Sequence, residues 1–472
     1  MRLSKHLLGT DRGYLEGILG ALRGRASVAR LALRVLPLQF FLLQLVVASA
    51  QLNSPVWSHR YSGEGTDEAR DIAVSPDGLV VYVTGYTEKF IGYWDKDIIT
   101  AAYDIATGQQ LWCQVHEDEG FYDEGVSVVV SPDSGRVYVT ASSFNGMNND
   151  YLIIAYNART GNVLWTYRYN PYDEDDRPLD MTISPDGRYV YVTGESFVPS
   201  QDYNYATIAI RTIDGQLEWQ QLYNGPHSSR SRDSGVGIEV SPDGSRVFVA
   251  GQTIGLEPVG NDPPPNLSVI AYNAISGEQL WVSVFDTPRS TNGGSYDIGI
   301  RRGGDFVYAT GFGVDANTPR TVISTACYRA DNGEHVWARR YDGNRGTPSA
   351  AYSVAAGQNY VFATGSDGAQ RVTIAYGAVQ GDIRWVSNLC SGYGVAVAVN
   401  HDESAVFVTG SGGYGNGVHT MATAAYDATT GEQLWAAFYE PIDLVGWGNS
   451  IALSPDGRFL FVAGMIDYDL SV

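Results

Sequence analysis

Carboxylates at the starts of repeated strands are the side chains of this sequence best placed to do chemistry. Asp71, Asp180 and Asp297 occupy equivalent strand-start positions, and Tyr93 with Trp94 stands in a loop of the same repeat. Where such strands converge, carboxylates beside aromatic rings would bind a ligand such as a sugar or a cationic peptide segment. The alternative interpretation of the three aspartates is structural, as acceptors for neighbouring backbone N–H groups.

A denser acidic run offers a candidate metal site. Asp173, Asp175 and Asp176 lie within four consecutive residues of one loop. Carboxylate oxygens are the hard ligands that Ca²⁺ prefers. The run is therefore a possible Ca²⁺ site, and the competing interpretation is a solvated acidic loop.

Other catalytic chemistry finds no support in the residues. None of the histidines after residue 50 has metal-ligand spacing, and no Gly-x-Ser-x-Gly nucleophile elbow stands between a strand and a helix. Cys113, Cys327 and Cys390 are widely separated and form no metal-binding pattern. No catalytic residue is predicted.

The balance of charge restricts the partners. The formal net charge is −21, although residues 1–50 carry seven basic and two acidic groups, so the remaining chain has a net charge of −26. A surface this acidic repels phosphate backbones, which argues against a nucleic-acid partner. A protein or polysaccharide partner is expected instead, with the chain acting as a monomer.

The first 50 residues have the character of a targeting segment. An apolar run at 35–48 follows Arg30 and Arg34 and ends in the small-x-small pattern Ala48-Ser49-Ala50. We interpret residues 1–50 as a signal peptide or N-terminal anchor and 51–472 as one folded domain. An organelle presequence is a further interpretation. No later stretch is apolar enough to span a membrane, so the predicted location is secreted or in the cell envelope.

Internal repetition organises the rest of the chain. Each unit of about 50 residues predicts four antiparallel strands, as at Asp71–Ser75, Val80–Gly85, Ile98–Tyr103 and Gln110–Trp112. Tight Ser-Pro-Asp-Gly turns join the first two strands. Eight tryptophans mark the units: Trp57, Trp112, Trp165, Trp219, Trp281, Trp337, Trp385 and Trp435.

The pattern predicts an all-β, eight-bladed propeller of four-stranded blades. The last unit lacks a fourth strand, and Val56–Tyr61 reads as a fourth strand without a blade. We expect this N-terminal strand to complete the last blade and close the ring.

The element Ala-Tyr-Asp-x-x-Thr-Gly-x-x-Leu-Trp, at Ala102–Trp112 and Ala425–Trp435, resembles the tryptophan-docking repeat of the PQQ-binding-like, quinoprotein alcohol dehydrogenase-like propellers. The resemblance implies that the eight tryptophans pack against the neighbouring blade. It also raises PQQ with Ca²⁺ as a cofactor. The adjacent cysteine pair common beside PQQ is missing here, which argues against PQQ and favours a chain without a cofactor.

These observations favour a non-catalytic, exported scaffold. The short turns are predicted on one face and the long, acidic, aromatic-rich loops on the other, where binding residues concentrate. The alternative is an enzyme, either a quinoprotein-like oxidoreductase or a Ca²⁺-dependent glycan-active enzyme at the same face.

Overall fold

The computed structural model describes most of the chain after the N-terminal segment. The predicted signal segment, Tyr93 and the end of the chain lie outside the described residues. Within the described part, no helix is long and apolar enough to cross a membrane. The described ranges are 55–91, 94–117, 122–225, 232–254, 265–285, 293–315, 318–343, 347–368, 370–413, 419–439 and 444–468.

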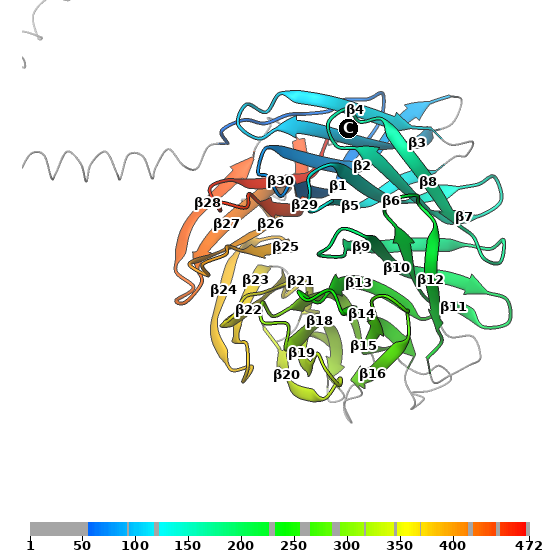
Figure 1. Cartoon of the computed structure of the whole chain (residues 1–472). Helices are drawn as coiled ribbons and strands as arrows, with labels where there is room; N and C mark the ends of the chain where they lie inside the picture. The colour runs from blue at the N-terminus through cyan, green and yellow to red at the C-terminus, as the bar shows by residue number, and fades with distance from the viewer. Residues whose placement is uncertain are drawn as a thin grey trace, which may run out of the picture. The chain divides into compact units, whose positions relative to one another are not determined.

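The repeat units fold as four-stranded antiparallel blades arranged in a ring (Figure 1). The first strand of each blade lies nearest the axis, and each following strand lies further out. The first two blades comprise β1 (Asp67–Val74), β2 (Val80–Phe90), β3 (Trp94–Asp104), β4 (Gln110–His116), β5 (Asp123–Val130), β6 (Arg136–Phe144), β7 (Asn149–Asn157) and β8 (Val163–Tyr169).

The next three blades repeat this order with similar strand lengths. They comprise β9 (Asp176–Ile183), β10 (Tyr189–Val198), β11 (Asp202–Arg211), β12 (Leu217–Tyr223), β13 (Ser234–Val240), β14 (Arg246–Ile254), β15 (Pro265–Asn273), β16 (Gln279–Phe285), β17 (Gly293–Ile300), β18 (Phe306–Asp315), β19 (Thr318–Arg329) and β20 (His335–Tyr341).

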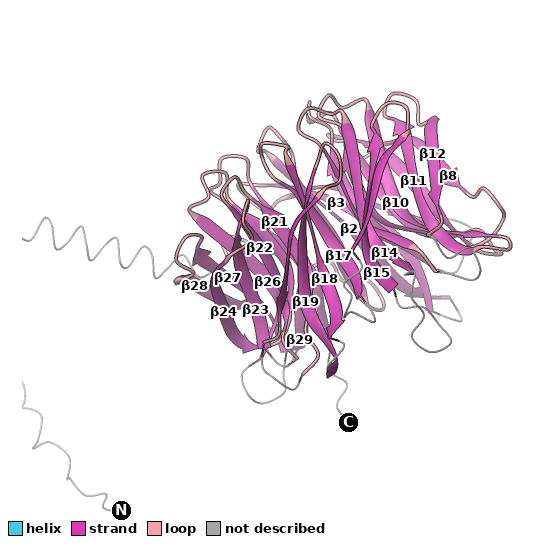
Figure 2. Cartoon of the chain, turned by 90° about the horizontal axis from the view of Figure 1, so that it is seen from below, coloured by secondary structure: helices cyan, strands magenta, loops and turns pink. Residues whose placement is uncertain are grey.

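The last two blades and a final hairpin complete the ring. They comprise β21 (Ala350–Ala356), β22 (Tyr360–Ser366), β23 (Gln370–Gly377), β24 (Ile383–Ser391), β25 (Gly394–Val399), β26 (Ala405–Gly413), β27 (His419–Asp427), β28 (Gln433–Tyr439), β29 (Leu444–Leu453) and β30 (Leu460–Tyr468). Figure 2 shows the ring edge-on, with the strands running between two loop-bearing edges.

The prediction of eight four-stranded blades is wrong. In the described part of the chain, seven blades have four strands, and the eighth repeat forms the two-stranded hairpin β29–β30. That hairpin pairs with the first blade through a bridge between Glu68 and Met465. Residues 55–61 form no strand, so the predicted N-terminal closing strand is also absent from the ring. The fourth strand of a blade pairs with the third strand, and no third strand is described in the eighth repeat.

Turn chemistry explains how the first two strands of a blade connect. In the first blade, Ser75 donates its hydroxyl to Asp77 at 2.5 Å, and the Val80 N–H donates to the same hydroxyl at 2.9 Å. Gly78 takes a φ of +73°, which suits glycine far better than other residues. The Ser-Pro-Asp-Gly sequence therefore fixes a short turn on this face.

Tryptophans join each blade to its neighbour. The Trp112 indole packs between Tyr82 of its own blade and Tyr156 of the next, with ring centroids 5.8 and 5.9 Å away. Its N–H donates to the Ala158 carbonyl at 2.8 Å. The ring lies over Gly161, where an added Cβ would come within 2.7 Å of it.

The hydrogen bond from a tryptophan indole N–H to a backbone carbonyl recurs around the ring at 2.8 to 3.2 Å. Trp57 makes it although its segment forms no strand, and its ring also lies 5.8 Å from Phe461 of the final hairpin. Trp435 packs on Phe407 of its own blade. The donors and acceptors, in order, are Trp57, Trp112, Trp165, Trp219, Trp281, Trp337 and Trp385 to Ile105, Ala158, Thr212, Ala274, Ala330, Ala378 and Ala428.

Substituting the glycine beneath a docked indole tests this contact. We expect Gly161→Ala to lower the free energy of unfolding by about 2–5 kcal/mol, because the methyl group meets both a positive φ and the Trp112 ring. Gly457→Ala is the matched control, since Gly457 has a φ of +69° but open space around it. It should cost about 1–2 kcal/mol. Urea denaturation measures both, and equal losses would contradict a special role for the docking contact.

Candidate functional site

The three strand-start aspartates belong to β1, β9 and β17, the first strands of their blades, and Figure 1 shows these strands near the centre of the ring. In each case one carboxylate oxygen accepts the N–H of the following residue, at 2.8 Å. The other oxygen accepts an N–H from the first strand of the next blade. Those second donors are Val128 for Asp71 at 2.8 Å, Ile238 for Asp180 at 2.9 Å and Val354 for Asp297 at 2.7 Å.

A bulge places each carboxylate for this bridge. The pairing of first and second strands shifts register beside Asp71, Asp180 and Asp297, which turns the side chain toward the neighbouring blade. Asp71 accepts two further bonds, from the Ser127 and Ser450 hydroxyls at 3.0 and 2.8 Å. Both oxygens of all three carboxylates therefore serve as acceptors between or within blades, and their binding of an external ligand remains a prediction.

Burial is the largest influence on the pKa of each of these carboxylates. It raises the pKa of Asp71, raises that of Asp180 well above its usual range, and raises that of Asp297 to about 6. The backbone donors oppose the shift, while the charges of Asp297 and Asp71 add to it at Asp180. The structure thus brings the three carboxylates within electrostatic reach of one another.

The acidic run divides into three environments. Asp173 is exposed, with a φ of +56°. Asp175 accepts the Asn149 N–H at 3.0 Å and the Tyr203 hydroxyl at 3.3 Å. Asp176 is 1% exposed, and neither of its carboxylate oxygens has a hydrogen-bond partner. The run therefore does not converge on one point.

No group of three or more His, Cys, Asp or Glu side chains could hold a metal among the described residues. Burial raises the pKa of Asp176 to about 7, and the charges of Asp150 and Asp175 contribute to the rise. The Ser196 hydroxyl lies near enough to oppose that shift, although it is not in hydrogen-bond geometry. Tyr93 and the side chain of Trp94 lie outside the described part, so their predicted role stays a prediction.

The long-loop face carries ion pairs that engage its basic groups. Lys96 contacts Glu124 at 2.5 Å and stands 3.9 Å from the Tyr86 ring centroid. Lys89 contacts Asp97 at 2.7 Å. Both lysines of this face are therefore already paired with carboxylates.

Four aromatic rings form a cluster at the long-loop ends of β17, β18, β21 and β25, which we call the aromatic rim: Tyr296, Phe312, Tyr352 and Tyr393. The Tyr296 ring lies 5.5 Å from Phe312 and 5.6 Å from Tyr352, and Tyr352 lies 6.4 Å from Tyr393. Tyr296 and Tyr393 are 41% and 45% exposed. The sequence analysis missed this rim, although a tyrosine directly before the strand-start position at Asp297 was a usable signal.

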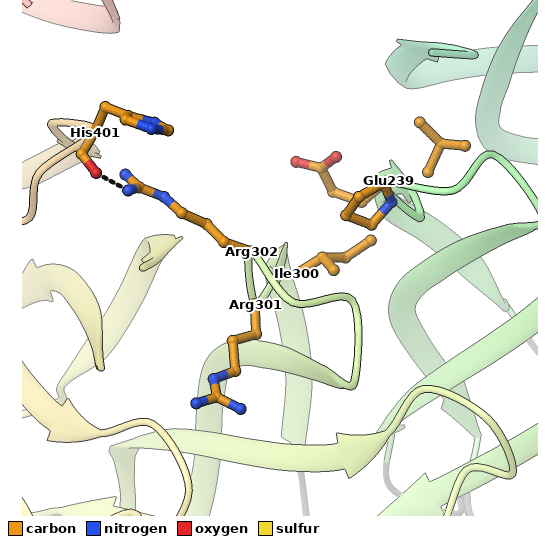
Figure 3. A pocket seen from close by; sticks show the side chains of 7 residues that line it. Glu239, Ile300, Arg301, Arg302 and His401 are labelled. Carbon is orange, nitrogen blue, oxygen red and sulfur yellow. Dashed lines mark hydrogen bonds between the residues drawn. The ribbon is translucent and has the colours of Figure 1, made fainter. Parts of the chain in front are cut away.

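A second feature that the sequence analysis missed is a pocket of about 410 Å³ on the short-turn side. Figure 3 shows Arg302 reaching toward His401, with Glu239 on the other side of the pocket. The Arg302 guanidinium donates to the carbonyls of Asn400, at 2.6 Å, and His401. Burial, with the charge of Asp297, raises the pKa of Glu239 to about 8. The sequence signal for this pocket was a glutamate in the otherwise apolar first strand of the fourth repeat, two residues before Ser241 of its turn.

The titration of Glu239 gives a testable dependence of stability on pH. The folded state holds its proton up to about pH 8, while the unfolded chain releases it near the usual value of 4.5. Between these values the folded state binds more protons, so stability falls as pH rises, by up to about 1.4 kcal/mol per pH unit. We expect Glu239→Gln to flatten this slope and to be more stable than the natural protein at about pH 8.

Thermal and urea unfolding across this pH range would measure the effect. Glu278→Gln is the control, because it removes the same charge from an exposed turn. Its profile should run parallel to that of the natural protein. A parallel profile for Glu239→Gln as well would show that Glu239 keeps an ordinary affinity for its proton.

The blades, the docked indoles and the bridged channel define the chain as a β-propeller. Among solved structures, the C-terminal WD40 domain of Sif2 is similar, with a TM-score of 0.52, 10% identity, and coverage of 85% of this chain and 96% of that one. Kuenenia stuttgartiensis hydrazine synthase gives a TM-score of 0.48 at 14% identity, covering 89% of this chain and all of that one. At such identities the likeness to the Sif2 domain concerns the fold alone.

The sequence model of one family matches directly. Residues 45–288 and 95–351 match the family described as outer membrane protein assembly factor BamB. The two stretches together span more than half of the chain, and the chain therefore belongs to this family of PQQ-like repeat propellers. No curated protein matches the sequence.

Proposed function

We propose that this chain is an exported, non-catalytic scaffold that binds a segment of a partner protein at its long-loop face. The aromatic rim is the observation that carries the proposal. Its rings contact one another in a row, yet Tyr296 and Tyr393 keep more than two fifths of their surface exposed. Exposed tyrosines that are held rigidly by neighbours provide contact area at a low entropic cost, which is typical of binding hot spots.

The family supports a protein as the partner. A family described as an outer membrane protein assembly factor acts on polypeptides, which favours a protein over a polysaccharide. The apolar run at 35–48 and Ala48-Ser49-Ala50 favour export to the envelope, where such a partner would be met. We therefore propose the envelope as the place of action.

The negative charge of this chain indicates which residue types a partner segment should carry. The chain after residue 50 has a net charge of −26, and on the long-loop face Lys89 and Lys96 already contact carboxylates. A segment that combines basic and aromatic residues would be attracted by the field and would stack on the rim. Its association should weaken as salt is added.

The channel residues do not fit the PQQ and Ca²⁺ that quinoprotein propellers use. The carboxylates nearest the axis accept backbone N–H groups from two strands each, so their oxygens are already committed. No two cysteines are adjacent in the sequence. These observations support a function without PQQ.

Binding to a peptide array that tiles outer membrane proteins of the host tests the proposal. We expect the purified chain to retain peptides rich in Arg, Lys and aromatic residues. The double variant Tyr296→Ala/Tyr393→Ala should bind them at least about tenfold more weakly, as for hot-spot residues. Fluorescence anisotropy on the best peptides, at about 50 and about 500 mM salt, would measure the loss and its salt dependence.

The double variant Ile213→Ala/Ile275→Ala is the control. Both isoleucines are exposed, at 73% and 59%, but they lie in turns of the opposite face. Peptide affinity should be unchanged in this variant. Equal losses in the two variants, or no loss in the rim variant, would overturn the proposed face. Binding confined to a glycan array would replace the protein partner with a polysaccharide.

A further inference from the structure

A row of buried oxygen atoms without hydrogen bonds runs across the third blade. Asp176 of β9 pairs with Ser196 of β10, and Ser196 pairs with Asn204 of β11. Directly paired residues place their side chains on the same face of a sheet. The three are 1%, 0% and 1% exposed. Both Asp176 oxygens, Ser196 Oγ and Asn204 Oδ1 lack a hydrogen-bond partner.

The corresponding aspartate is satisfied in other blades. In the fourth blade, Asp233 accepts the Thr253 hydroxyl at 2.7 Å on one oxygen and the Gly225 N–H at 2.8 Å on the other. In the first blade, Asp67 accepts the Thr87 hydroxyl and the Gly63 N–H in the same way, at 2.5 and 2.6 Å. In these two blades the aspartate therefore ties the incoming loop to the second strand.

The third blade lacks the backbone N–H donor of this pair because a proline stands at its position. Gly63 and Gly225 each stand two residues after a tyrosine, and the residue two positions after Tyr169 is Pro171. Proline has no backbone N–H to donate. Asp176 therefore occupies the same repeat position and is buried, but it lacks the backbone N–H bond that Asp67 and Asp233 accept.

The surroundings supply further oxygen atoms. Asp150 of β7 has one oxygen on Arg168, at 2.8 Å, while its other oxygen is buried and has no partner. The Tyr169 hydroxyl is also buried without one. The Asn204 amide is oriented by its Nδ2, which donates to Gln201 at 2.8 Å, and this orientation leaves Oδ1 free.

We propose that Asp176, Ser196 and Asn204 bind a Ca²⁺ ion on the face of the third blade that packs against the second blade, with Asp150 contributing negative charge. Unpaired buried carboxylates are costly unless a proton, water or cation satisfies them. A proton would satisfy a single oxygen of this set, whereas Ca²⁺ takes six to eight oxygen ligands, including carboxylate, amide and water oxygens. Asp176 supplies a negative charge that favours the divalent ion, and Asp150 adds the part of its charge that Arg168 does not offset.

The site differs from the one predicted from sequence. Asp176 is retained, but Asp173 is exposed and Asp175 is bonded to Asn149 and Tyr203. The site is also independent of the proposed partner-binding face, because none of its oxygens belongs to the aromatic rim. Failure of one proposal therefore leaves the other untouched.

Terbium luminescence and Ca²⁺ calorimetry on the EDTA-treated chain test the proposal. The Tyr169 ring lies beside Asp176 and 5.3 Å from the Tyr151 ring, so bound Tb³⁺ should be sensitised by tyrosine excitation. We expect one saturable site, displaced by Ca²⁺, and a melting temperature that rises with Ca²⁺. Asp176→Asn should weaken binding at least about tenfold.

Asp173→Asn is the matched control, since it makes the same substitution on an exposed residue of the same loop. Its affinity should stay within about twofold of the natural protein. If Asp176→Asn fails to fold, Pro171→Gly replaces it, because a restored N–H would satisfy Asp176 and compete with the ion. That variant should bind Ca²⁺ more weakly yet melt no lower without metal. Absence of a saturable site, or equal affinity in Asp176→Asn and Asp173→Asn, would overturn the proposal.

Discussion

The contact between a tryptophan of one blade and a glycine turn of the next is the constraint on which the remaining structure depends. Each blade is a small antiparallel sheet that is unstable alone and must bury both faces against neighbours. The Trp112 indole does this with two ring contacts, one hydrogen bond and close approach to Gly161. Because the same geometry recurs from blade to blade, each unit is placed at a similar angle to the one before it, and the first strands converge on one axis.

Where the first strands converge, buried carboxylates would repel one another, and only some of the repeats carry a carboxylate there. Asp71, Asp180 and Asp297 stand in the first, third and fifth blades, whereas the equivalent residues of the other repeats are small: Ser127, Gly237, Ser353, Ala396 and Ser450. The alternation lets each carboxylate reach across to a neighbouring N–H without facing another carboxylate directly. Burial still raises the pKa of all three, so this inner seam is held by bonds that are sensitive to charge.

The two loop-bearing faces of the ring differ in the length and regularity of their loops, because their turns have different sequence requirements. Ser-Pro-Asp-Gly turns are closed by their own side chains and a glycine with positive φ, which keeps them short. The crossover loops carry no such requirement, and exposed rings gather at this edge, with Tyr393 in a crossover loop and Tyr296 near the start of β17. Asp176 shows a similar variation at a single position, where Pro171 replaces the glycine donor found in the first and fourth blades.

The sequence alone determined the repeat, its four strands, its turns and its membership of the PQQ-like propellers, because these depend on local spacing and on side chains that act within one unit. It overestimated the number of complete blades, since whether Val56–Tyr61 pairs as a strand depends on a partner strand far away in the chain. The bridging bonds of Asp71, the aromatic rim and the unpartnered oxygens of Asp176 were decided by tertiary structure. Each depends on which residues of separate repeats meet across a seam, and spacing within a repeat carries no information about those distances.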